Sequence, residues 1–131
     1  MTQILLPPGW PRPPGYSLGI AATGRVVMTG GLIGWDEGGV FAEGFAAQVA
    51  RALDTTLAVL AEAGARPDHV LRQTWYVTSR DAYNAALPEL GPIWRARFGR
   101  HYPAMAVIIV AGLVEPAAMV EIETTAVIPD A

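Results

Sequence analysis

The chain has 131 residues and a net charge of −3, and 52% of its residues are hydrophobic while only 16% are charged. The acidic balance argues against a nucleic-acid partner, because binding phosphates requires a basic face. The sequence has no cysteine, which excludes disulfides, thiolate catalysis and sulfur-ligated metals. The length fits a single domain, placed at residues 1–131. With so few charges, we expect contacts between subunits to cover the excess apolar surface, although a very dense core would also account for the composition.

The first 15 residues are rich in proline, with prolines at positions 7, 8, 11, 13 and 14. This proline content predicts an extended N-terminal arm over residues 1–15, without helix or ladder pairing. No basic region precedes a long apolar run there, so no signal peptide is expected. The longest apolar stretch, residues 103–114, is shorter than the roughly 20 residues that span a bilayer. We therefore expect a cytoplasmic protein without a membrane partner.

The segment after the arm predicts two short strands and a helix. Strand-forming residues occur at 25–28 and at 32–33, and a glycine-rich turn over residues 36–39 ends the second strand. Residues 44–63 place hydrophobic side chains at three- and four-residue spacing, with polar residues mostly on the other face. This pattern predicts an amphipathic helix that ends at Gly64.

The middle of the chain predicts a strand over residues 69–78 and a second helix over residues 81–98. Pro88 and Pro92 lie inside the helical pattern. Since proline removes a backbone donor and clashes with the preceding turn, the helix either starts near Pro88 or is broken there.

Two strands, residues 104–111 and 118–128, complete the chain. The resulting order of elements predicts an α+β fold, an α/β sandwich in which two helices back one mixed sheet. The first of these strands is apolar at both sets of alternating positions, which is typical of a strand covered on both faces. Because two helices shield only one face, we expect the sheet of a neighbouring chain to cover the other.

The final strand alternates between apolar and acidic positions. Glu121 and Glu123 fall on the face assigned to subunit contact, opposite the set that contains Val120 and Ile122. A carboxylate in a wet crevice between subunits is suited to acid/base catalysis, since partial burial raises its pKa towards neutrality. Alternatively, one or both carboxylates reach solvent at the rim.

Several short motifs together resemble the Rid/YjgF (L-PSP) family, whose best-known members are enamine/imine deaminases. The motifs are GYS at 15–17, VMTGG at 27–31, AG at 63–64, VLRQT at 70–74, YPA at 102–104 and VEIETTAV at 120–127. The resemblance implies a chorismate-mutase-like fold, assembly as a homotrimer around the open sheet faces, and a small-molecule site in each cleft between subunits. It implies a hydrolytic reaction that needs no cofactor.

The resemblance also implies roles for individual residues. Glu121 matches the carboxylate that positions water and shuttles protons, Tyr16 and Ser17 match residues that line the cleft, and Gly31 matches a glycine whose backbone approaches the ligand. One position departs from the family: where deaminases of 2-imino acids carry an arginine that grips the substrate carboxylate, this chain has Met105. The usual 2-iminopropanoate substrates are therefore not expected.

Extra aromatic residues near the expected cleft resemble a branch that includes 2-aminomuconate deaminases. Trp35 belongs to this set, and Arg12 or Arg100 could supply the missing cation; packing for the tryptophan and a solvated surface for the arginines are the alternatives. His69 and His101 have no metal-like spacing, so we expect no metal site. The functional alternative is a non-catalytic small-molecule-binding or regulatory member that has lost the arginine. Ribonuclease activity, sometimes attached to this family, fits the acidic composition poorly.

Overall fold

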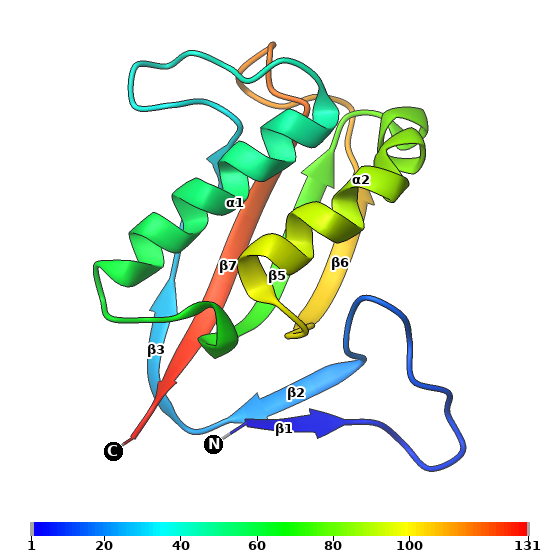
Figure 1. Cartoon of the computed structure of the whole chain (residues 1–131), viewed down its shortest axis with the longest axis vertical. Coiled ribbons are helices and arrows are strands. Elements are labelled where there is room, and N and C mark those ends of the chain that lie inside the picture. The colour runs from blue at the N-terminus through cyan, green and yellow to red at the C-terminus, as the bar shows by residue number, and fades with distance from the viewer. Residues whose placement is uncertain (1, 131) are drawn as a thin grey trace.

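The computed structural model describes residues 2–130 of the chain. It contains a sheet with two helices on one face, and a separate N-terminal hairpin (Figure 1). The elements are β1 Thr2–Leu5, β2 Gly19–Ala22, β3 Gly24–Met28, β4 Leu32–Ile33, α1 Phe45–Ala61, a short 3-10 helix Pro67–His69, β5 Val70–Val77, α2 Arg80–Phe98, β6 Ala104–Ile109 and β7 Val120–Pro129.

The main sheet has the strand order β3–β7–β5–β6, and β4 also pairs with β7. β5 and β6 are parallel and are connected by α2, whereas β7 runs antiparallel to β3, β4 and β5. A parallel pair needs a crossover connection, and α2 supplies it. The structure thus confirms the predicted α+β fold with a mixed sheet backed by two helices.

The core lies between the sheet and the two helices. Val120 and Ile122 of β7 are fully buried on this side, together with Leu53 and Leu60 of α1, while Glu121 lies on the opposite face. Burial alternates along β7 as period-two side-chain placement requires. The predicted division of this strand into an inner apolar set and an outer acidic set is confirmed.

α2 is one continuous helix, which resolves the alternatives left open by its prolines. The hydroxyl of Ser79 caps its first turn by accepting a hydrogen bond from the backbone N–H of Ala82 at 3.0 Å, and Gly99, with φ of +61°, ends it. Pro88 and Pro92 both lie on the exposed side of the helix. The carbonyls that lose an N–H partner there face water, so the helix continues past both prolines.

The N-terminal segment differs from the prediction. β1 pairs antiparallel with β2 from Thr2 opposite Ala22 to Leu5 opposite Gly19, so the expectation of no ladder pairing in residues 1–15 was wrong. The physical reason is that β1 ends before Pro7, the first residue that lacks a donor. The prolines lie in the connection to β2, and the hairpin extends beyond the end of the main sheet (Figure 1).

Within residues 2–130, no helix combines the length and the apolar character needed to cross a membrane.

Candidate functional site

A pocket of about 600 Å³ opens between α2 and the sheet strands β5 and β6. Such a volume accommodates a small organic ligand. The residues that line it come from the arm, both strands and α2: Pro14, Gly15, Tyr16, Trp75, Tyr83, Leu87, Leu90, Gly91, Trp94, Arg95, Tyr102, Met105 and Val107. The pocket therefore contains two residues that the sequence singled out, Tyr16 and Met105.

Ser17 holds the arm at the rim of this pocket. Its backbone N–H donates to the carbonyl of Pro103 at 3.0 Å, and its hydroxyl donates to the carbonyl of Tyr102. Ser17 also forms a parallel bridge with Ala104 at the start of β6. Ser17 itself is buried, and its hydrogen bonds place Tyr16 beside the strand that carries Met105. Ser17 therefore serves to position its neighbour.

The walls of the pocket present apolar surface. The indole N–H of Trp75 donates to the side-chain oxygen of Gln73 at 2.9 Å, and that of Trp94 donates to the carbonyl of His101 at 3.0 Å. The ring of Trp94 also stacks on Phe98 with centroids 4.0 Å apart. Because both indole donors are already satisfied, the rings offer a ligand contact surface but no hydrogen bond.

Arg95 is the charged residue of this pocket, and the sequence reading did not identify it. It ends a row of α2 residues at four-residue spacing, Tyr83, Leu87, Gly91 and Arg95, all of which line the pocket. Residues spaced by four lie above one another on a helix face. The four-residue spacing could have indicated from the sequence that these residues share one helix face. Only the fold shows that this face lies over β6.

Glu121 and Gly31 form a second feature on the sheet face that the helices leave uncovered. A β-carbon placed on Gly31 would lie 2.2 Å from a carboxylate oxygen of Glu121 and 2.9 Å from its Cγ. The glutamate side chain therefore occupies the space beside the glycine backbone, a close approach that glycine allows. Glu121 is half-buried there.

Tyr76 lies directly opposite Glu121 in the β5–β7 ladder. Its hydroxyl donates to a carboxylate oxygen of Glu123 at 2.6 Å. This hydrogen bond is the main reason that the pKa of Tyr76 is raised, and desolvation and the negative charges of both glutamates act in the same direction. The uncovered face thus carries two acidic side chains and a tyrosine in adjacent positions.

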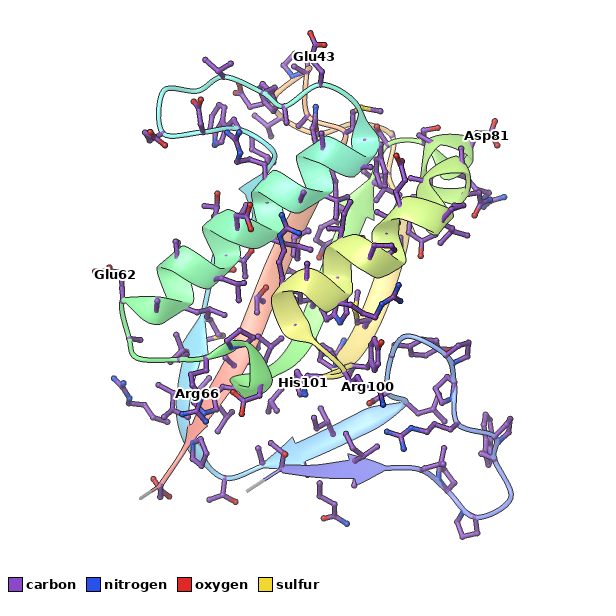
Figure 2. All side chains as sticks on the ribbon, in the orientation of Figure 1. Glu43, Glu62, Arg66, Asp81, Arg100 and His101 are labelled. Atoms are coloured by element: carbon purple, nitrogen blue, oxygen red, sulfur yellow. The ribbon has the colours of Figure 1, made fainter. Side chains whose placement is uncertain are left out.

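The remaining predicted site residues lie elsewhere. Arg12 and Ser17 line a separate cavity of about 40 Å³ beside the hairpin. Trp35 packs on Phe41 with ring centroids 5.4 Å apart, in the loop before α1. Arg100 lies beside His101 at the turn between α2 and β6, and it does not line the large pocket (Figure 2).

The predicted residues therefore form two groups within one chain. Tyr16 and Met105 lie in the pocket on the helix side, whereas Gly31 and Glu121 adjoin on the uncovered side and do not line that pocket. A site that uses both groups needs a second copy of the chain to bring them together.

Both histidines are engaged with the backbone. A ring nitrogen of His101 lies 2.6 Å from the carbonyl of Val70, and Nδ1 of His69 accepts a hydrogen bond from the backbone N–H of Arg66 at 2.9 Å. Among residues 2–130, no three His, Cys, Asp or Glu side chains gather in a way that could hold a metal ion.

Comparison with known proteins gives consistent matches. Residues 12–128 match the sequence family described as Endoribonuclease L-PSP. A Rid family protein of unknown function from Yersinia pestis is similar, with 27% identity, a TM-score of 0.82, and coverage of 97% of this chain and 98% of that one. RidA from an Antarctic Psychrobacter has 27% identity, a TM-score of 0.70, and coverage of 96% and 99%. A YjgF family member from Mycobacterium tuberculosis has 30% identity, a TM-score of 0.67, and 88% coverage of both chains. No curated protein matches the sequence.

Proposed function

The chain belongs to the Rid/YjgF/L-PSP family, whose members include RidA enamine/imine deaminases, and from this membership we propose that it hydrolyses a small enamine or imine. In this reaction the enamine tautomerises to the imine, water adds to the imine carbon, and the C–N bond breaks. One water is consumed, and one carbonyl compound and one ammonia are formed. Glu121 takes the proton from the attacking water and returns it to the leaving nitrogen.

The observation that supports this proposal is the position of Glu121 over Gly31. The carboxylate is half-buried and is held against bare backbone, so its oxygens lie where a small planar molecule and a water could approach without a side chain in the way. An acid/base group must lie within hydrogen-bond reach of the proton that it moves.

We propose that the complete site forms between subunits of a homotrimer. The uncovered sheet face has exposed apolar residues in addition to its glutamates: Met28 is 70% exposed, Val26 is 58% exposed and Ile108 is 45% exposed. Apolar surface of this kind is typical of a subunit contact. Packing this face on a neighbouring chain would bring Gly31 and Glu121 of one copy to the pocket of the next.

Ammonia release tests the deaminase activity directly. We would supply imines derived from 2-aminoacrylate and, separately, 2-aminomuconate, and compare the wild type with Glu121→Gln, which keeps the size of the side chain but removes its basicity. Ammonia release by the wild type at least a hundredfold above the variant is expected, since general acid/base catalysis contributes about 10²–10⁴-fold. Equal, background release by both proteins on both compounds and on an aryl-substituted imine, that of phenylalanine, would refute the proposal.

Met105 favours one second candidate, a family member that binds a small molecule without converting it. Its thioether cannot make the charge-assisted contact of an arginine with a carboxylate. Under this alternative the pocket binds its ligand with the same affinity in the wild type and in Glu121→Gln, and neither protein releases ammonia. Ribonuclease activity is not proposed, because His69 and His101 both bond to backbone atoms.

A further inference from the structure

The pocket has one charged residue among lining side chains that are mostly apolar, apart from the hydroxyls of Tyr16, Tyr83 and Tyr102. Among the lining residues that the structure describes, Arg95 is the sole charged side chain, and no carboxylate accompanies it. Arg95 is exposed at the mouth of the pocket, and its guanidinium, which is always charged, attracts an anion whose apolar body can enter the pocket.

Within residues 2–130, no ion pair neutralises the charge of Arg95. The ion pairs within residues 2–130 join Arg51 to Asp36, Arg66 to Asp68 and Arg97 to Asp54, and Arg95 takes part in none of them. Its helix neighbours explain this, because the positions three and four residues away hold Gly91, Pro92, Phe98 and Gly99, none of which is acidic.

Gly91 provides the space in which the guanidinium lies. A β-carbon on Gly91 would lie 3.1 Å from Nη1 of Arg95 and 3.7 Å from its Cζ, which is a tight contact. Glycine inside a helix costs about 1 kcal/mol relative to alanine. Here the missing side chain allows the arginine to turn back along the helix, and both residues line the pocket.

The aromatic walls determine what the rest of the ligand must be. Trp75 and Trp94 have satisfied indole donors, and Met105 and Val107 of β6 add further apolar surface. A flat, conjugated or aromatic group can bury its faces here without losing hydrogen bonds to water. A short aliphatic acid such as pyruvate would leave most of the pocket unfilled.

We propose that Arg95 is the carboxylate-binding residue of this pocket, and that the ligand is a monocarboxylate with an aromatic or conjugated body. This inference rests on the proposed function only in one respect, namely that the ligand of the pocket is the substrate or the product of the proposed deaminase. Arg95 then supplies the positive charge that the 2-imino-acid deaminases carry at the position of Met105. The arginine lies on α2, whereas position 105 lies on β6. The substrate class narrows from small 2-imino acids to aryl-substituted or extended conjugated ones.

Calorimetric titration of the full-length protein in its native oligomeric state tests the binding part. The probes are phenylpyruvate and two of its fragments. Phenylacetone keeps the aromatic ring but lacks the carboxylate, and pyruvate keeps the carboxylate but lacks the ring. We expect phenylpyruvate to bind more tightly than either fragment. Equal affinity for phenylpyruvate and phenylacetone, or no binding of phenylpyruvate by the wild type, would overturn the inference.

Three variants assign the interaction to Arg95. Arg95→Gln should weaken phenylpyruvate binding by about ten- to a hundredfold, because a charge-assisted hydrogen bond is lost. Arg95→Lys keeps the charge and should lose less. Arg100→Gln is the matched control, because Arg100 is also exposed, lies just after the end of α2 and does not line the pocket. A loss in Arg100→Gln equal to that in Arg95→Gln would contradict the assignment.

Imine hydrolysis separates this inference from the proposed function. An amino-acid oxidase supplies the imine of phenylalanine or of alanine, and ammonia release is followed for the wild type and Arg95→Gln. Tight phenylpyruvate binding, with ammonia release no faster than spontaneous hydrolysis of the imine, would support the inference and refute the deaminase activity. The opposite result is faster ammonia release from the alanine imine than from the phenylalanine imine, unchanged in Arg95→Gln. This result would support the deaminase activity and refute the role of Arg95.

Discussion

The side chain of Glu121 occupies the space that a β-carbon on Gly31 would need, with one carboxylate oxygen 2.2 Å from that position. A side chain at position 31 must therefore displace the carboxylate. The atoms that must move, Oε2, Cδ and Cγ, all belong to the side chain of Glu121, so a change of its rotamer can relieve the contact without moving the backbone. This relationship allows the position of the carboxylate to be changed separately from the stability of the fold.

Gly31→Ala should reduce deaminase activity at least tenfold while the melting temperature changes by no more than a few degrees, since an acid/base group is displaced from its working position. Gly30→Ala is the matched control, because a β-carbon on Gly30 meets no atom within 4 Å. Steady-state ammonia release and thermal denaturation measure the two effects. Equal activity of the two alanine variants would show that the position of the carboxylate does not matter.

Gln48 connects α1 to two loops from inside the core, where it is 3% exposed. Its amide nitrogen donates to the carbonyls of Ala42 at 3.3 Å and Ala117 at 3.0 Å, and its oxygen accepts from the backbone N–H of Met119 at 2.8 Å. Gln48→Leu should lower the free energy of unfolding by about 1–3 kcal/mol, because it removes the hydrogen bonds of the buried amide to these backbone groups. Chemical denaturation measures this. An unchanged midpoint would mean that water or a shifted loop satisfies these groups.

Tyr76 should titrate late, because its hydrogen bond to Glu123 raises its pKa. A raised folded-state pKa gives a stability contribution that is fully present below the ordinary tyrosine pKa and is lost as the pH rises through the folded-state value. In an absorbance titration of ionised tyrosine, Tyr76→Phe should remove part of the late step. The residual late step belongs to Tyr83, whose pKa is raised by burial. Identical late steps in both proteins would contradict the hydrogen bond.

Pro92 lies on the exposed side of α2, where it denies the helix a hydrogen bond to the carbonyl of Pro88. Pro92→Ala should restore this bond and raise the free energy of unfolding, by up to about 3 kcal/mol. The gain is reduced because the unfolded chain has more conformational entropy without the proline. Differential scanning calorimetry measures the change. A lower melting temperature would indicate that the proline ring makes a packing contact in the assembled protein.

Part of this architecture could be predicted from the sequence, for identifiable physical reasons. The alternation along β7 indicated which side of the sheet is buried, because strand periodicity places Ile122 and Glu121 on opposite faces. The β1–β2 hairpin could not be predicted from composition. Its pairing depends on Leu5 and Gly19 meeting across a proline-containing connection, which is a non-local contact.

The sequence could predict those site residues that can be recognised individually. It could not predict a residue whose role depends on how two elements pack together. Tyr16 and Met105 were identified and do line the pocket, but Arg12 and Arg100 were considered as cations and lie outside it. Arg95 was missed because its role depends on how α2 lies over β6. A crossing of two elements is fixed by tertiary packing and not by local pattern.

Subunit complementation tests whether the pocket of one subunit works with Glu121 of another. Glu121→Gln lacks the carboxylate but has an intact pocket, whereas Leu87→Trp fills the pocket from a half-exposed position and keeps Glu121. Each variant alone should be inactive. When the two are co-expressed at equal levels, about a quarter of the sites combine an intact pocket with an intact carboxylate, so about a quarter of wild-type ammonia release should return. Mixed oligomers that form but stay inactive, beside an active wild type, would contradict a site shared between subunits.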